Sequence, residues 1–207
     1  MAILHKATLT PSKPELIAAY LPTVSGFQVT AGAIDHLGAY RFDDPAGDVG
    51  IESHLVTVAD GRTLHLPLTY RNEPLASADD WFVGTLEHSV LGTRYVYDAV
   101  ADPVYVTELV RTILTGGEQV PLVVHLPDGG TIERDNTVFV NGTGTASTIP
   151  AISIGGATRE GAVTAIDLGG VSVIVRHAPR PGVSGSKVLV GTWPGAGRPA
   201  VLAELLA

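Results

Sequence analysis

Two runs of alternating residues flank the dipeptide Asp60-Gly61, and this pattern constrains the fold more than any other part of the chain. Asp-Gly is a preferred two-residue turn between antiparallel strands, so residues 50–70 are predicted to form a β-hairpin. Such a turn would pair Thr57 with Leu64, and directly paired residues share a face. The core face is then expected to hold Ile51, Ser53, Leu55, Thr57, Leu64, Leu66, Leu68 and Tyr70. The opposite face is expected to carry Glu52, His54, Val56, Val58, His65 and Thr69.

A helix is predicted on each side of this hairpin. Before it, Ser12 and Glu15 have the spacing of a capping box, which predicts a helix over residues 14–21. After it, Asp102 and Pro103 suit an N-cap and the first helical position, which predicts a helix over residues 103–115. Residues 27–42 are expected to supply strands of the same sheet.

From residue 118 the chain becomes rich in Gly, Thr and Val, in short runs typical of strands. A length of 207 residues is enough for one sizeable core or two small ones. We therefore predict a boundary near Gly117. Residues 1–117 would form an α+β domain and residues 118–207 a β-rich domain, closed by a short helix around residues 200–206.

Composition argues against several kinds of partner and site. The formal net charge is −8 and the basic residues are scattered, so neither nucleic acid nor an anionic membrane is an expected partner. There is no cysteine, and hence no disulfide or thiolate site. No apolar run approaches the ~20 residues that span a bilayer, and no signal peptide is recognised at the N-terminus. A cytoplasmic protein without a cofactor is the resulting expectation.

The stretch WFVGTLEHSVLGTRYVYDAVADPVY, residues 81–105, holds the densest run of distinctive residues. Together with HLPLTYRNEPL before it, this stretch resembles the N-terminal cap domain of bacterial maltokinases. The resemblance covers residues 1–117 and carries no equally specific motif beyond them. It implies a cystatin-like fold, a curved antiparallel sheet packed on two helices.

In full-length maltokinases the cap precedes two kinase lobes that transfer phosphate from ATP to maltose. A kinase of that type needs a catalytic aspartate, a magnesium ligand and a phosphate-facing lysine, and none of these is recognised in this sequence. A Walker motif is also missing. The resemblance therefore implies a cap-like protein without kinase activity, and no catalytic residue is assigned.

Several polar and aromatic residues of the cap-like stretch are candidates for contact with a ligand or partner. In one interpretation Arg94 and Asp98 fix the loop while Glu87 and His88 face the ligand. In the structural alternative Arg94 and Asp98 form an ion pair, Tyr97 packs and His88 binds a backbone carbonyl. Trp81 is a candidate platform for a sugar ring, or a core residue. The candidates are Trp81, Glu87, His88, Arg94, Tyr97 and Asp98.

The expected polar face of the hairpin offers a weaker candidate for a metal site. Glu52, His54 and His65 would project from it together, with the two histidines as diagonal neighbours. Two imidazoles and a carboxylate are a suitable ligand set. The alternative is a solvated sheet face.

Two main functional hypotheses follow. The first is a non-catalytic binding or regulatory module, which acts on a protein partner or a sugar ligand of maltose, trehalose or α-glucan metabolism. The second is a small metal-binding protein or enzyme that uses Glu52, His54 and His65 or the Glu87-His88 loop. Exposed strand edges in the second half also allow a homodimer.

Overall fold

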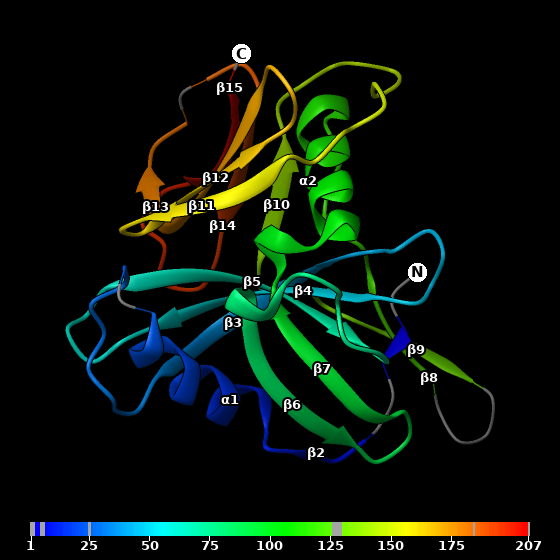
Figure 1. Ribbon diagram of the computed structural model, residues 1–207, viewed down its shortest axis with the longest axis vertical. Coiled ribbons are helices and arrows are strands. Elements are labelled where there is room, and N and C mark those ends of the chain that lie inside the picture. Colours follow the sequence, from blue (N-terminus) through cyan, green and yellow to red (C-terminus); the bar gives the residue numbers. More distant parts are fainter. Residues whose placement is uncertain (1–2, 5–6, 25, 126–129, 184, 207) are drawn as a thin grey trace.

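The computed structural model describes residues 3–4, 7–24, 26–125, 130–183 and 185–206, and in them the chain forms an α+β fold rich in strands (Figure 1). Two six-stranded antiparallel sheets, which we call the first and second sheets, make up most of it. Each packs against one α-helix. The predicted fold class, a curved antiparallel sheet with two helices followed by a β-rich half, is confirmed.

The first sheet contains the strands of the cap-like region. Its order is β2 (Leu9–Thr10), β6 (Phe82–His88), β7 (Gly92–Asp98), β5 (Thr63–Arg71), β4 (Gly50–Thr57) and β3 (Asp35–Phe42). Figure 1 shows that β6 and β7 curve away from β4 and β5 around helix α1 (Lys13–Tyr20). This curvature creates a concave face that α1 partly fills.

The hairpin forms where it was predicted, but its register is one residue away from the prediction. Thr57 pairs with Thr63, and Leu55 pairs with His65. The cause is the turn: Val58 N–H donates to the Arg62 carbonyl, so three residues rather than two form the loop. Gly61 takes the left-handed conformation there, with φ +84°. Three-residue loops with a glycine at this position are a common hairpin type, and a one-residue shift exchanges the faces of the side chains.

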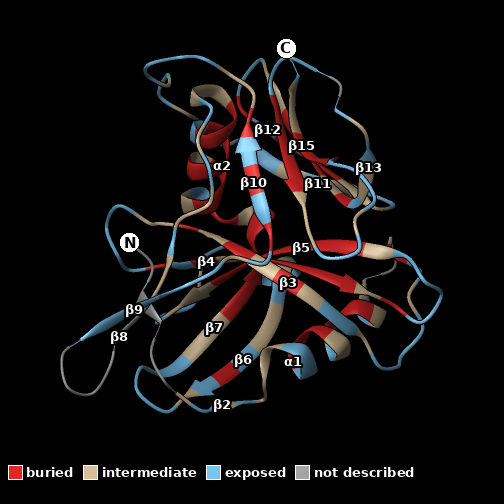
Figure 2. Cartoon of the chain, turned by 180° about the vertical axis from the view of Figure 1, so that it is seen from behind, coloured by how far each residue is buried: buried red, intermediate tan, exposed pale blue. Residues whose placement is uncertain are grey.

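The expectation of one core face and one solvated face was also wrong, because β4 and β5 are buried on both sides (Figure 2). On the concave side, Val56, Leu64, Leu66 and Leu68 form a core with residues of α1. On the opposite side, Ile51 and Leu55 belong to a larger core that includes residues of the second helix and second sheet. A strand buried on both faces carries apolar residues at consecutive positions, which hides the alternation.

Both predicted helix starts are confirmed. Ser12 accepts from Glu15 N–H, and the Glu15 carboxylate accepts from Ser12 N–H, so α1 begins with a complete capping box. Helix α2 (Pro103–Thr115) begins at Asp102, whose carboxylate accepts from Val104 N–H. It ends at Gly116, which takes the left-handed conformation. Short 3₁₀ turns lie at Leu21–Thr23, Asp79–Trp81 and Ala99–Ala101.

The second sheet has the order β10 (Phe139–Gly142), β14 (Val188–Thr192), β15 (Ala200–Leu206), β13 (Ser172–Pro181), β12 (Val163–Asp167) and β11 (Gly156–Glu160). The helix predicted around residues 200–206 is wrong, since this segment is β15. It lies between β13 and β14 and pairs with both. Backbone pairing on two edges overrides the helical propensity of alanine and leucine in so short a segment.

A third sheet of three strands lies apart from the other two. Its order is β1 (Ile3–Leu4), β8 (Leu122–His125) and β9 (Thr131–Arg134). Strand β1 therefore pairs with a strand from beyond residue 117.

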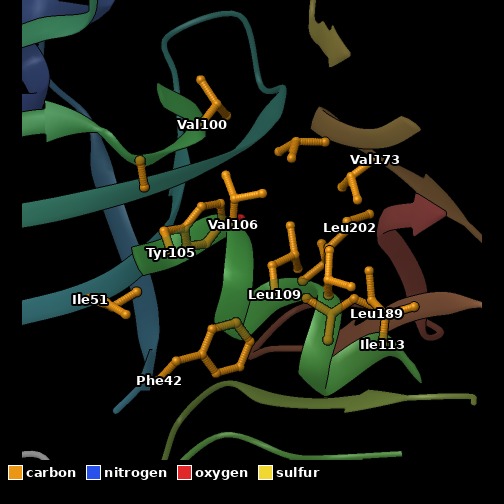
Figure 3. Packing of buried hydrophobic residues seen from close by; sticks show 14 of the residues in the cluster. Phe42, Ile51, Val100, Tyr105, Val106, Leu109, Ile113, Val173, Leu189 and Leu202 are labelled. Atoms are coloured by element: carbon orange, nitrogen blue, oxygen red, sulfur yellow. The ribbon is translucent and has the colours of Figure 1, made fainter. Parts of the chain in front are cut away.

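Helix α2 joins the two large sheets. Figure 3 shows Tyr105, Val106, Leu109 and Ile113 of α2 among side chains of both sheets, with Phe42 and Ile51 at one end and Leu189 and Leu202 at the other. Hydrophobic contacts therefore cross the boundary placed near Gly117, which itself stays a prediction. Within the described ranges, no helix is long and apolar enough to cross a membrane.

Candidate functional site

A pocket of about 580 Å³ opens on the concave side of the first sheet. Its walls come from the start of α1, strand β2, the turn between β3 and β4, and the tip of the β6–β7 hairpin. The volume lies within the ~300–1,000 Å³ of small-molecule sites. Charged or hydrogen-bonding side chains lining it include Lys13, Arg41, Asp43, Asp44, Asp48, Glu52, Tyr70, His88 and Arg94.

The floor of the pocket is organised by Glu52 of β4. Its carboxylate accepts from the Arg41 guanidinium at 2.9 Å and from the Lys13 ammonium, and its side chain is only 12% exposed. Burial alone would raise the pKa of the Glu52 carboxyl, but the Lys13 and Arg41 charges hold that pKa far below its ordinary value. Burial lowers the pKa of Lys13, and the Glu52 charge opposes that shift. A buried carboxylate is thus stabilised by two cations.

A chain of three hydrogen-bonding side chains leads from this pocket to the molecular surface. Tyr70, in the pocket wall, has its hydroxyl 3.0 Å from His54 Nε2, and His54 Nδ1 lies 2.9 Å from His36 Nε2. His54 is buried, whereas His36, on edge strand β3, is exposed. Burial lowers the pKa of His54 to about 3, so this imidazole is neutral near pH 7. The Lys13 ammonium lies 4.9 Å from the centre of the Tyr70 ring.

The rim of the pocket is held by bonds to the backbone. Asp44 accepts from the N–H groups of Ala46, Asp48 and Val49, which fixes the turn between β3 and β4. At the β6–β7 tip, His88 Nδ1 accepts from the N–H groups of Val90 and Leu91. The Nδ1 of His88 is therefore unprotonated. At its Nδ1, His88 thus binds two backbone N–H groups and not the predicted backbone carbonyl.

Arg94 also lines the pocket, and its role differs from the one predicted. Its guanidinium donates to the Leu91 carbonyl at 2.6 Å. Its Nε is buried and has no hydrogen-bond partner among the described residues. The predicted pairing of Arg94 with Asp98 is wrong, because Asp98 binds Arg159 of the second sheet instead. Register explains this, since Arg94 pairs with Leu86 on the pocket side whereas Asp98 lies beside β5 at the far end of β7.

The remaining candidates of the cap-like stretch lie outside the pocket lining. Glu87 is exposed and accepts from the Thr93 hydroxyl at 2.8 Å. Tyr97 is buried, and its hydroxyl accepts from Leu75 N–H at 3.1 Å. Strand alternation explains why Glu87 faces away from its neighbour His88.

Trp81 and Asp98 take part in a second polar cluster, at the junction of the two large sheets. The Arg159 guanidinium binds the buried Asp98 carboxylate and lies 4.8 Å from the Trp81 ring and 5.0 Å from the Phe27 ring. The Tyr20 hydroxyl donates to the same carboxylate at 3.3 Å. Burial alone would lower the pKa of Arg159, but the Asp98 charge raises it. Trp81 therefore packs on a cation of the same chain.

His65 lies on the opposite face of the sheet from His54, so the predicted triad of Glu52, His54 and His65 does not assemble. The Nδ1 of His65 donates to the Arg176 carbonyl at 3.2 Å, and its Nε2 accepts from the Tyr40 hydroxyl at 2.9 Å. The one-residue register shift separates the two histidines. In the described part of the chain, no group of three or more His, Asp or Glu side chains is placed to hold a metal ion.

Of the predicted site residues, the pocket brings together Glu52, His88 and Arg94. Sequence reasoning missed Lys13, Arg41, Tyr70 and His36. Arg41 could have been found by aligning β3 with β4, because it pairs directly with Glu52. Lys13 gave no such signal, since only the packing of α1 on the sheet brings it to Glu52.

Comparison with known proteins gives one assignment. The comparison with curated proteins finds no match. A family model described as the maltokinase N-terminal cap domain matches residues 20–102, which include five of the six strands of the first sheet and much of the pocket lining. The chain therefore contains a maltokinase N-terminal cap-like domain over residues 20–102.

Proposed function

We propose that the protein is a binding module. The pocket on the concave side of the first sheet would hold a small polyhydroxylated ligand, such as a sugar of maltose, trehalose or α-glucan metabolism. Binding rather than chemistry is the proposed role of the pocket. The family match supplies the metabolic context, and the composition of the pocket supports the class of ligand.

The observation that carries this proposal is that the charges lining the pocket occur in both signs and are held in place. Glu52 is fixed between Lys13 and Arg41, and Asp44 is fixed by three backbone N–H groups. Such preorganised donors and acceptors suit adjacent hydroxyl groups, each of which donates and accepts. Leu9, Leu86 and Leu91 add apolar surface for the C–H groups of a sugar ring.

Isothermal titration calorimetry with glucose, maltose and trehalose tests the proposal. We expect saturable binding of at least one of these sugars. Glu52→Gln should weaken it at least tenfold, because the neutral amide no longer holds Lys13 and Arg41 in place. Glu87→Gln is the matched control, since Glu87 faces away from the pocket and should leave the affinity unchanged.

Two results would overturn the proposal. One is the lack of any heat of binding from a folded protein at millimolar sugar. The other is ATP-dependent phosphorylation of maltose by the purified chain, measured as ADP release. Glu52→Gln folding should be verified by circular dichroism, so that lost binding is not confused with lost structure.

A second candidate role, contact with a protein partner, is favoured by the tip of the β6–β7 hairpin. Val90 and Leu91 are adjacent there, with 58% and 45% of their surfaces exposed. Co-migration with an enzyme of maltose or trehalose metabolism on size-exclusion chromatography would support this role. Loss of co-migration in a Val90→Ser, Leu91→Ser double variant would assign it to the tip.

A further inference from the structure

The Tyr70–His54–His36 chain is continuous from the pocket to the surface, and its hydrogen bonds can run in only two directions. In the outward direction, Tyr70 O–H donates to His54 Nε2 and His54 Nδ1–H donates to His36 Nε2. In the inward direction, His36 Nε2–H donates to His54 Nδ1 and His54 Nε2–H donates to the Tyr70 oxygen. A neutral imidazole has one donor and one acceptor nitrogen, so each direction fixes the tautomer of His54.

The two directions present different groups to the pocket. In the outward direction the Tyr70 O–H donates to His54, so the phenol oxygen can only accept a hydrogen bond from a ligand. In the inward direction that oxygen is already an acceptor, and the O–H is released to donate into the pocket. Burial and the Glu52 charge raise the pKa of Tyr70, so the phenol keeps its proton in both cases.

Protonation of His36 allows only one of these directions. A charged imidazolium carries N–H on both nitrogens, so its Nε2 must donate to His54. His54 stays neutral over this range because burial lowers its pKa to about 3. When His36 is neutral, the outward direction is favoured, because Tyr70 O–H has no other acceptor at hydrogen-bond distance among the described residues.

We propose that this chain is a relay, in which protonation of His36 at the surface switches Tyr70 from an acceptor to a donor in the pocket. The relay rests on the proposed function in one respect only, the identity of the ligand that Tyr70 contacts in the pocket. By thermodynamic linkage, a ligand that accepts from Tyr70 binds more tightly when His36 is protonated, and its binding promotes proton uptake by His36.

The charged groups around the relay are few and come from three elements. Glu52 of β4, Lys13 of α1 and Asp35 of β3 act on His36, whereas Glu52, Lys13 and Arg41 act on His54. Burial lowers the pKa of His36, and the Glu52 charge opposes that shift. Glu52 has its pKa far below the range of His36, so the carboxylate charge is constant while His36 titrates.

Two histidines elsewhere in the chain provide an internal reference. His65 Nδ1 and His177 Nδ1 each face a backbone carbonyl, at 3.2 and 3.0 Å, and a carbonyl can only accept. Both rings are therefore fixed as Nδ1–H tautomers. Their spectra should not change tautomer while His36 titrates.

The test is nuclear magnetic resonance of the protein without ligand, labelled with ¹⁵N-histidine and ¹³Cζ-tyrosine, from about pH 8 to about pH 5, where histidines titrate. We expect His54 to change from Nδ1–H to Nε2–H, and the Tyr70 Cζ resonance to shift, both with the midpoint of His36. Tyr70→Phe assigns the tyrosine resonance. His36→Gln, at an exposed position, cannot be protonated and should abolish both changes.

The relay is wrong if His54 keeps one tautomer while His36 titrates, or if the Tyr70 shift persists in His36→Gln. Because no ligand is present, either result leaves the sugar-binding proposal untouched. Conversely, if the protein shows both spectral changes but binds no sugar, the relay stands and the proposed ligand is wrong.

Discussion

His177 Nδ1 donates to the backbone carbonyl of His65 at 3.0 Å, and these two residues, 112 positions apart, join the first sheet to the second. The link is reciprocal, because His65 Nδ1 donates to the carbonyl of Arg176, next to His177. The Nε2 of His177 accepts from the Thr164 hydroxyl at 2.9 Å. Both rings are thus buried and neutral, with both nitrogens hydrogen-bonded.

The first prediction concerns the pH dependence of stability. Burial lowers the pKa of His65 to about 3 and that of His177 to about 4. In the unfolded chain, histidines have ordinary pKa values of ~6.5. Between that pH and the lower pKa values of the folded state, the unfolded chain binds more protons than the folded protein. The stability is therefore complete above about pH 6.5 and is lost as the pH falls towards 4, by roughly 3 kcal/mol for each ring.

Urea unfolding at a series of pH values measures this loss. His177→Asn removes one titrating ring while keeping a side-chain N–H near the His65 carbonyl, so its stability should fall less steeply with acidification. An equal slope in the variant and the wild-type protein would contradict the assignment of the pH dependence to His177.

The second prediction concerns the ion pair between Arg159 and Asp98. Arg159→Ala leaves the Asp98 carboxylate, 1% exposed, without its cation, and such losses cost about 3–5 kcal/mol. Arg111→Ala is the control, because Arg111 is 48% exposed and pairs with Glu108 on the same helix. Pairs of that kind contribute about 0.3–0.5 kcal/mol. Similar unfolding free energies for the two variants would contradict a structural role of Arg159 at the junction.

The third prediction concerns the hairpin loop. Gly61→Ala places a Cβ in the left-handed conformation, which costs about 1–2 kcal/mol. Space is available, since nothing lies within 4 Å of the added Cβ, so the cost is conformational. Gly32→Ala, also in open space but without a positive φ, should be neutral or slightly stabilising. Thermal unfolding distinguishes the two, and equal melting temperatures would argue against the three-residue loop.

The fourth prediction concerns the start of α2. Asp102 caps the helix and also accepts two bonds of 2.7 Å from the Arg71 guanidinium. Asp102→Asn keeps an oxygen for the cap but loses the charge, whereas Asp102→Ala loses both. We expect Asp102→Ala to be the less stable of the two by about 1 kcal/mol, the usual contribution of an N-cap. Chemical denaturation of both variants provides the measurement, and equal stabilities would remove the cap from the explanation.

Interactions between close neighbours in the sequence could be predicted from the sequence alone. The capping box of Ser12 and Glu15, the cap at Asp102 and the existence of the hairpin around Gly61 each depend on residues within about four positions of one another. The cap-like motif in residues 81–105 was recognised for the same reason, because it is contiguous. Glu52, His88 and Arg94 were each singled out from the sequence, but in separate groups, and only the structure brings the three into one pocket.

Tertiary structure decided the rest, because those contacts join residues far apart in the chain. A single extra loop residue placed His54 and His65 on opposite faces, and pairing with β13 and β14 made a strand of residues 200–206. Asp98 binds Arg159, 61 positions away, and not Arg94. These pairings depend on which surfaces are buried against each other. The spacing of residues along the sequence does not reveal that packing.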